Sequence, residues 1–143
     1  MKKPKLLFLC TGNRARSQMA EAFLRKHAGD QFEVYSAGLE PGPIHPYVYK
    51  VMDEVGLELE GHYSKGIGDF LGQVYFGILI TVCAKAEENC PIFPGLGERH
   101  FWPLEDPVAF KGTEEETLAK FRQVRDEIEE RILAWLDSRK ETE

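Results

Sequence analysis

The chain has 143 residues, of which 43% are hydrophobic and 29% charged, and its formal net charge at pH 7 is −6. This length suits one domain spanning residues 1–143, and this composition excludes a disordered or fibrous protein. The negative charge argues against nucleic-acid binding, although a local loop can still bind a small anion. The opening MKKPKLLFLC has too short an apolar run for a signal peptide, and no stretch reaches the length of a membrane span. We therefore expect a cytoplasmic monomer.

Strands and helices are predicted to alternate along the first half of the chain. The apolar run at residues 5–9 predicts a strand that is buried on both faces. Apolar residues at helical spacing from Ser17 predict a helix that Gly29 ends. Residues 32–38 predict a second strand, and residues 46–56 predict a helix that opens on a proline.

The second half of the chain is less regular until its last segment. Residues 73–82 predict a buried strand, although Gly77 weakens it. The glycine-rich residues 61–72 fit either a loop or a short helix. A fourth strand is predicted within ERHFWPLEDP, where Pro103 ends it.

The final segment carries the clearest helix signal. Thr113 and Glu116 have the spacing of a capping box. Six apolar residues follow at helical spacing and are predicted to face the core: Leu118, Phe121, Val124, Ile128, Ile132 and Trp135. Strands that alternate with helices predict an α/β protein, with a parallel sheet and helices on both faces.

The loop between the first strand and the first helix, CTGNRARS, carries the strongest chemical signal. Ligands of open α/β sheets bind at the carboxyl ends of strands, and amides at a helix N-terminus bind phosphate-like oxyanions. Arg16 can hold two oxyanion oxygens, and its charge favours the thiolate of Cys10, to which Ser17 can donate a hydrogen bond. The loop between them consists of Thr11, Gly12, Asn13, Arg14 and Ala15. Of these, Gly12 and Asn13 tolerate left-handed backbone. These residues alone leave two interpretations open: an oxyanion-binding nucleophile, or a buried cysteine before a capped helix.

The Cys-x5-Arg spacing, followed by Ser and a helix, resembles the phosphate loop of the low-molecular-weight protein tyrosine phosphatase superfamily. In that superfamily the Cys and Arg bracket the bound oxyanion, and an Asp in a late Asp-Pro pair protonates the leaving group. Asp106 precedes Pro107 at the matching place in this chain. The resemblance therefore implies that Asp106 is the general acid.

The other two cysteines, Cys83 and Cys90, lie in TVCAKAEENCP. Their spacing is not that of a zinc site, and we expect no metal there. In a continuous helix their Cα atoms would lie roughly 10.5 Å apart, at a rise of about 1.5 Å per residue. A disulfide needs about 4.4–6.8 Å. The two cysteines can therefore join only if this segment is looped or unwinds.

With three cysteines around an oxyanion loop, nearly the whole chain resembles the thioredoxin-coupled arsenate reductases. The resemblance rests on CTGN, RSQMAE, VYSAG, the Cys-x6-Cys-Pro segment, DP and the final helix. It implies a flavodoxin-like three-layer sandwich, which is the low-molecular-weight phosphatase fold, with a four-stranded parallel sheet. It also implies arsenic detoxification, with arsenate or a similar oxyanion as substrate and thioredoxin as protein partner.

The resemblance implies a mechanism at named positions. Cys10 attacks the arsenic of bound arsenate while Arg16 and the loop amides hold its oxygens, and Asp106 protonates the departing hydroxyl. Cys83 then attacks Cys10 and releases arsenite. Cys90 attacks Cys83 and leaves a disulfide that thioredoxin reduces. Glutaredoxin or a low-molecular-weight thiol is the alternative electron donor.

Two features depart from the family pattern. Where members often have CTGNSCRS, this loop has Arg14, which adds positive charge at the mouth, and Ala15, which removes a thiol outside the relay. Some relatives also bind potassium beside the loop through an Asp and three further residues. The three further positions are Asn13, Glu21 and Ser36, but Lys65 stands in place of the Asp. Either the Lys65 ammonium takes the ion's place, or Lys65 is a solvated loop residue. We expect no organic cofactor and an activity that does not depend on potassium.

Two rival functions remain open. A phosphatase acting on phosphotyrosine or on small phosphate esters needs only Cys10, Arg16 and Asp106. Tyrosine-specific relatives usually carry an aromatic residue just after the Asp-Pro pair, where this chain has Val108. The other rival is a non-catalytic module that binds oxyanions.

Overall fold

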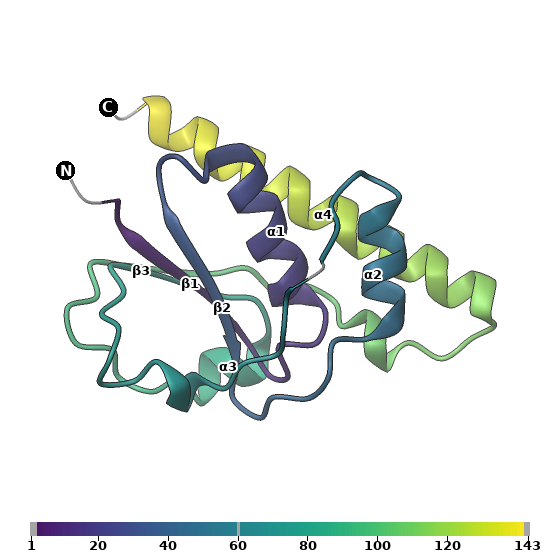
Figure 1. The fold of residues 1–143 in the computed structure, drawn as a ribbon, viewed down its shortest axis with the longest axis horizontal. Coiled ribbons are helices and arrows are strands. Elements are labelled where there is room, and N and C mark those ends of the chain that lie inside the picture. The colour runs from purple at the N-terminus through teal and green to yellow at the C-terminus, as the bar shows by residue number, and fades with distance from the viewer. Residues whose placement is uncertain (1–2, 60, 142–143) are drawn as a thin grey trace.

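The computed structural model describes residues 3–59 and 61–141 and contains a four-stranded parallel sheet in the order β2-β1-β3-β4 (Figure 1). The strands are β1 (Lys5–Cys10), β2 (Glu33–Gly38), β3 (Ile78–Thr81) and β4 (Glu98–Phe101). The helices are α1 (Arg16–Ala28), α2 (Pro46–Asp53), α3 (Ala84–Glu88) and α4 (Glu114–Glu141), with short 3-10 turns η1 (Ile67–Asp69) and η2 (Pro107–Ala109). The first two residues of the signal-like start and the last two of the predicted domain lie outside the described residues.

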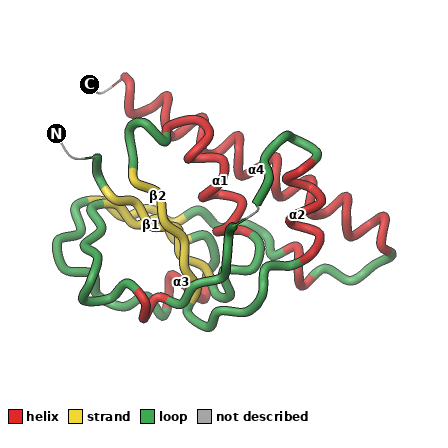
Figure 2. The backbone as a smooth tube through the Cα atoms, in the orientation of Figure 1, coloured by secondary structure: helices red, strands yellow, loops and turns green. Residues whose placement is uncertain are grey.

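The two faces of the sheet are covered unequally (Figures 1 and 2). On one face α1 packs beside α4, and Phe8 of β1 contacts Trp102, which in turn contacts Trp135 of α4. On the other face, α3 lies beside loops whose aromatic side chains pack on the sheet, such as Phe76 against Tyr35 of β2. The predicted α/β fold is therefore confirmed, with α1, α2 and α4 together on one side of the sheet and the short α3 on the other (Figure 1).

The predicted strand at residues 73–82 is too long, because only Ile78–Thr81 forms a strand. Phe76 lies in the preceding loop and is 1% exposed, since its ring packs edge-on against Phe70 and Phe93. Phe76 is thus apolar because it packs in the core from a loop. A short apolar run in a sequence does not show whether its residues form a buried strand or a buried loop.

The start of α4 is capped as predicted. The backbone amide of Thr113 donates to Glu116 Oε1 at 3.0 Å, and the amide of Glu116 donates to Thr113 Oγ1 at 3.1 Å. All six predicted core positions of this helix are buried: Leu118, Phe121, Val124, Ile128, Ile132 and Trp135. Local capping and periodicity are therefore enough to define this element.

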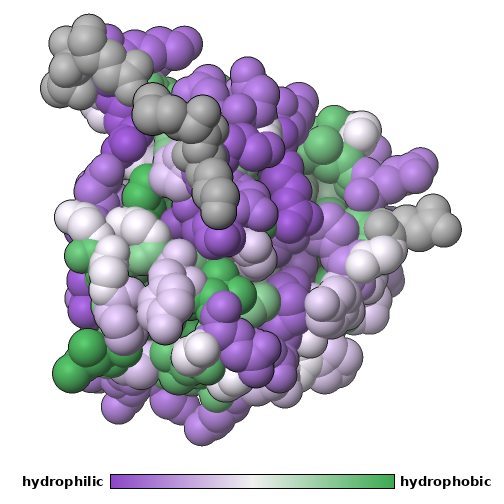
Figure 3. Space-filling model, turned by 60° about the vertical axis from the view of Figure 1, so that its left-hand side comes forward, coloured by the Kyte–Doolittle hydropathy of each residue, from purple (hydrophilic) through white to green (hydrophobic). Residues whose placement is uncertain are grey.

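Within the described residues, no helix is both long enough and apolar enough to cross a membrane. On the face drawn in Figure 3, hydrophobic residues form small groups between hydrophilic ones. Scattered exposed apolar side chains of this kind are normal in globular proteins. Among the residues that the structure describes, Ile92 is the most exposed large hydrophobic residue, at 91%, and it lies two positions after Cys90.

Candidate active site

The loop after β1 turns around the sulfur atom of Cys10. This side chain is 2% exposed, and its Sγ accepts a hydrogen bond from the backbone amide of Asn13 at 3.1 Å. Ser17, in the first turn of α1, places its Oγ 2.9 Å from the same sulfur. Asn13 has a φ of 52°, the left-handed conformation predicted for it, whereas Gly12 does not need a positive φ. A backbone amide and a hydroxyl therefore both lie within hydrogen-bonding distance of the sulfur atom.

Glycine at the end of β2 allows the loop to pack tightly on the sheet. A Cβ atom on Gly38 would lie 2.7 Å from the backbone nitrogen of Asn13 and 2.7 Å from the carbonyl carbon of Gly12. These neighbours are backbone atoms that cannot rotate away. The position of the loop over β2 therefore requires the absence of a side chain at this point.

Arg16 and Asp106 face each other across the loop. Arg16 is 9% exposed, and its Nη1 donates to the carbonyl oxygen of Leu104 at 3.0 Å, while its Nη2 lies 3.6 Å from Asp106 Oδ2. Asp106 Oδ1 accepts a hydrogen bond from the backbone amide of Val108 at 3.0 Å. The segment before η2 thus fixes both the guanidinium and the carboxylate over Cys10.

A cavity of about 220 Å³ opens at this point and is lined by Cys10, Thr11, Gly12, Arg14, Ala15, Arg16, Glu40, Asp106 and Val108. This volume is several times larger than the roughly 30 Å³ that one water molecule occupies in the liquid. A tetrahedral oxyanion therefore fits in the cavity. Arg14 stands at its mouth, where its Nε donates to the carbonyl oxygen of Pro43 at 2.9 Å. Two arginines and the N-terminus of α1 make the cavity suitable for an anion.

A second thiol lies at the rim of the same loop. Cys83 is 5% exposed, and its Sγ lies 3.2 Å from Thr11 Oγ1. It precedes α3 and accepts a hydrogen bond from the backbone amide of Ala86 at 3.4 Å. Cys90 follows α3, and burial raises the pKa of its thiol. All three thiols are free, and a helix separates the second from the third.

Polar side chains connect the loop to a buried carboxylate. The Nδ2 of Asn13 donates to Ser17 Oγ at 2.8 Å and to Ser36 Oγ at 2.9 Å. Ser36 Oγ donates in turn to Glu21 Oε1 at 2.6 Å, and Glu21 is 2% exposed. Arg25 Nη1 lies 2.6 Å from the other oxygen of Glu21. The residues expected from the potassium-binding relatives are thus brought together, but as a hydrogen-bonded chain.

Lys65 is part of this chain. Its Nζ lies 3.7 Å from Glu21 Oε1 and donates to the carbonyl oxygen of Tyr63 at 2.9 Å, and its backbone amide donates to Asn13 Oδ1 at 2.8 Å. Lys65 is 9% exposed, so the alternative of a solvated loop residue is wrong. Burial lowers its pKa, and the neighbouring Glu21 opposes this effect. The side-chain oxygens of Asn13, Ser36 and Glu21 thus already face donors of the protein.

Sequence reasoning gave no role to Gln18 or Arg25. Gln18 Nε2 donates to Asn13 Oδ1 at 2.9 Å and to the carbonyl oxygen of Tyr63 at 3.0 Å, so it joins the loop to the segment that carries Lys65. Gln18 is fully buried on α1. Gln18, Glu21 and Arg25 recur at three- and four-residue steps along α1, and this polar face of the helix is the signal that identifies such positions.

The parallel sheet and the cysteine-arginine loop at its carboxyl edge define a protein of the phosphatase-like, oxyanion-binding class. A family model described as low molecular weight phosphotyrosine protein phosphatase matches residues 5–143, and the chain belongs to that family. Within it, the chain is 44% identical to an arsenate reductase from Bacillus licheniformis over 133 residues, which cover 92% of this chain and 94% of the relative.

Two solved structures extend this result. An arsenate reductase in the phosphate binding state superposes with a TM-score of 0.74 at 30% identity, covering 94% of this chain and 98% of that one. A thioredoxin-dependent arsenate reductase from Corynebacterium glutamicum superposes with a TM-score of 0.75 at 29% identity, covering 99% of this chain and 64% of that one. The resemblance stated from the sequence is confirmed.

Proposed function

We propose that the protein reduces arsenate to arsenite through a relay of three cysteines, with thioredoxin as the final reductant. The observation that carries the proposal is the second thiol at the rim of the oxyanion loop, where Cys83 Sγ lies 3.2 Å from Thr11 Oγ1. A phosphatase has no use for this thiol. A reductase needs it, because two electrons must reach arsenic and one thiol supplies only half of a disulfide.

In the first step, Arg16 and the loop amides bind the oxygens of arsenate in the cavity above Cys10. The thiolate of Cys10 attacks arsenic and forms a sulfur–arsenic bond. Asp106 donates a proton to the departing hydroxyl, which leaves as water, because an oxygen leaving group departs readily only when neutralised. The amide of Asn13 and the hydroxyl of Ser17 orient the thiolate.

In the second step, the thiolate of Cys83 attacks Cys10 Sγ. The sulfur–arsenic bond breaks and its electron pair stays on arsenic, which leaves as arsenite, while the two sulfurs form a disulfide. Cys90 then attacks Cys83, Cys10 leaves as a thiolate, and the resulting Cys83–Cys90 disulfide passes to thioredoxin. The named thioredoxin dependence of the Corynebacterium relative supports this donor. An odd, small set of cysteines also suits a reducing compartment, so we place the reaction in the cytoplasm.

We also propose that the Lys65 ammonium supplies the positive charge that potassium supplies in some relatives. The support is its position beside the buried carboxylate of Glu21. On this basis the activity is independent of potassium.

The decisive experiment combines the protein with thioredoxin, thioredoxin reductase and NADPH and follows the loss of NADPH when arsenate is added. We expect consumption that disappears in Cys83→Ser and in Cys90→Ser, tested singly, and in Cys10→Ser. Hydrolysis of p-nitrophenyl phosphate without NADPH consumption would instead identify a phosphatase, which needs only Cys10, Arg16 and Asp106. The absence of activity in both assays would identify a non-catalytic module that binds oxyanions.

A further inference from the structure

The side chain of Glu87 connects α3 to the sheet. Its carboxylate accepts a hydrogen bond from the hydroxyl of Thr81, at the end of β3, and forms an ion pair with Arg99 Nη2 of β4 at 2.7 Å. The same Arg99 nitrogen also donates to the backbone carbonyl of Glu87 at 3.3 Å. These contacts join the middle of the segment between Cys83 and Cys90 to two strands.

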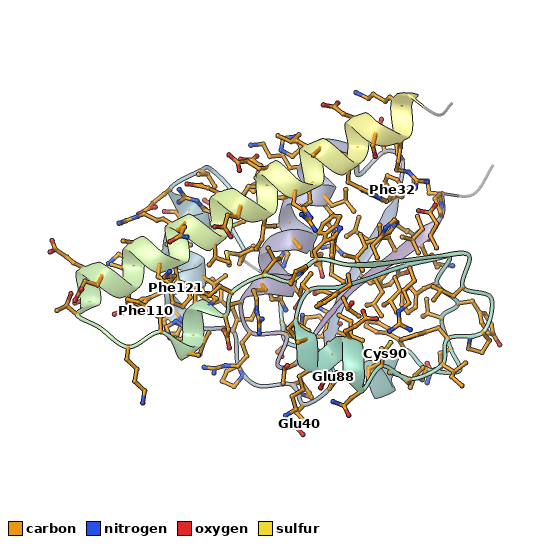
Figure 4. The ribbon with its side chains drawn as sticks, turned by 180° about the vertical axis from the view of Figure 1, so that it is seen from behind. Phe32, Glu40, Glu88, Cys90, Phe110 and Phe121 are labelled. Carbon is orange, nitrogen blue, oxygen red and sulfur yellow. The ribbon has the colours of Figure 1, made fainter. Side chains whose placement is uncertain are left out.

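Cys90 follows Glu87 by three residues and is half-buried beside the segment whose backbone carbonyl, that of Glu87, accepts from Arg99. Figure 4 shows it beside α3, at the edge of the molecule that also carries Glu88 and Glu40. The charged groups that face its thiol are Glu87 from α3, which raises the pKa of Cys90, and Arg99 from β4, which lowers it. Burial raises it further and is the largest of the three effects. The pKa of Cys90 is therefore expected to depend on whether the Arg99 guanidinium is paired with Glu87.

The relay requires these contacts to break. With α3 formed, Cys83 directly precedes the five-residue helix and Cys90 follows its C-cap, Asn89. At about 1.5 Å per residue the helix alone is roughly 7.5 Å long, which is more than the roughly 4.4–6.8 Å between the Cα atoms of a disulfide. Opening α3 moves Glu87, because it belongs to the helix, whereas Arg99 belongs to β4 and stays on the sheet. A guanidinium that has lost its carboxylate is then available to a nearby thiolate.

We propose that Arg99 changes partner during the relay: it pairs with Glu87 and holds α3 closed in the reduced protein, and it stabilises the Cys90 thiolate when α3 opens. Arg99 is thus a positioning residue for the last exchange. In that exchange Cys90 attacks Cys83 Sγ of the Cys10–Cys83 disulfide, the old bond breaks, and Cys10 leaves as a thiolate without any external oxidant. The inference rests on the proposed function, because it concerns a step of the same relay.

The two members of the ion pair then have opposite effects. Glu87→Gln weakens the hold on α3 and removes a negative charge from beside Cys90, so it favours the thiolate. Arg99→Met breaks the same ion pair but removes the positive charge, so it disfavours the thiolate. If the pair were merely structural, both substitutions would act in the same direction.

The first measurement is the pH dependence of Cys90 alkylation by iodoacetamide in a Cys10→Ser, Cys83→Ser background. We expect the apparent pKa to fall by about half a unit in Glu87→Gln and to rise by about half a unit in Arg99→Met, at this partly exposed site. Arg99→Lys retains the charge and is expected to leave the profile unchanged. Arg122→Met, which breaks the remote pair with Glu54, is the matched control.

The second measurement is a single turnover with arsenate in the absence of thioredoxin, quenched by alkylation and resolved by mass spectrometry. We expect Cys83–Cys90 disulfide to form about threefold faster in Glu87→Gln and about threefold slower in Arg99→Met, with Cys10–Cys83 accumulating in the latter. Shifts of equal sign in the two variants, or none in either, would overturn the proposal. The alkylation arm uses no arsenate, so a protein that fails to reduce arsenate refutes the proposed function separately.

Discussion

Replacing Lys65 by methionine tests how the buried carboxylate of Glu21 is neutralised. The substitution keeps most of the side-chain volume and removes the ammonium that lies 3.7 Å from Glu21 Oε1. At this distance two unit charges attract by about 4–5 kcal/mol at an effective dielectric constant of about 20. Two effects reduce this loss. Arg25 remains 2.6 Å from the same carboxylate, and the variant removes the free-energy cost of burying a charged lysine. We therefore expect a net loss of about 1–2 kcal/mol in the free energy of unfolding.

The assay is urea unfolding followed by the fluorescence of the two buried tryptophans, Trp102 and Trp135, in sodium chloride and in potassium chloride at equal ionic strength. The unsubstituted protein is expected to have the same stability and the same activity in both salts. Lys65→Met is expected to be less stable in both, and to recover in part in potassium. Lys50→Met, at an exposed position of α2, is the control for the loss of a lysine. Potassium activation of the unsubstituted protein, or an unchanged stability in Lys65→Met, would refute the reasoning.

Three further substitutions test the loop and its support. Ser17→Ala removes a hydrogen-bond partner of Cys10 and an acceptor of Asn13 Nδ2, so we expect iodoacetamide to modify Cys10 about tenfold more slowly and the free energy of unfolding to fall by about 1 kcal/mol. Gly38→Ala places a methyl group 2.7 Å from loop backbone, and we expect kcat/KM for arsenate to fall at least tenfold; an unchanged value would contradict the packing argument. Hydrogen bonds from Arg122 lower the pKa of Glu54 to about 2, so the ion pair stabilises the fold above about pH 4.5 and loses this effect as pH falls toward 2. Glu54→Gln is expected to cost about 1 kcal/mol at pH 7 and almost nothing near pH 2, measured by urea unfolding at each pH.

Elements with local signals were predictable from the sequence. The capping box of Thr113 and Glu116 defines the start of α4, and the loop from Cys10 to Arg16 needs only its spacing to be recognised. The loop before β3 could not be predicted, because Phe76 is buried by aromatic residues that lie on other segments.

The supporting contacts of the site were harder to predict for the same physical reason. Lys65 reaches Glu21 across more than forty positions of sequence, and its burial depends on how the intervening segment returns to the loop. Arg99 meets Glu87 only because β4 lies beside β3 in the sheet. Such pairs depend on topology, so residue spacing does not reveal them.

The unequal covering of the sheet has a consequence for local unfolding. The large helix–helix contact of α1 with α4 lies on one face, and α3, which the proposed relay requires to open, is a five-residue helix on the other. Regions that open on their own have smaller free energies of opening than the whole protein has of unfolding. Amide hydrogens in α3 are therefore expected to exchange much faster than those of α4. The proposed relay would then open and close one short helix while the remainder of the protein stays folded.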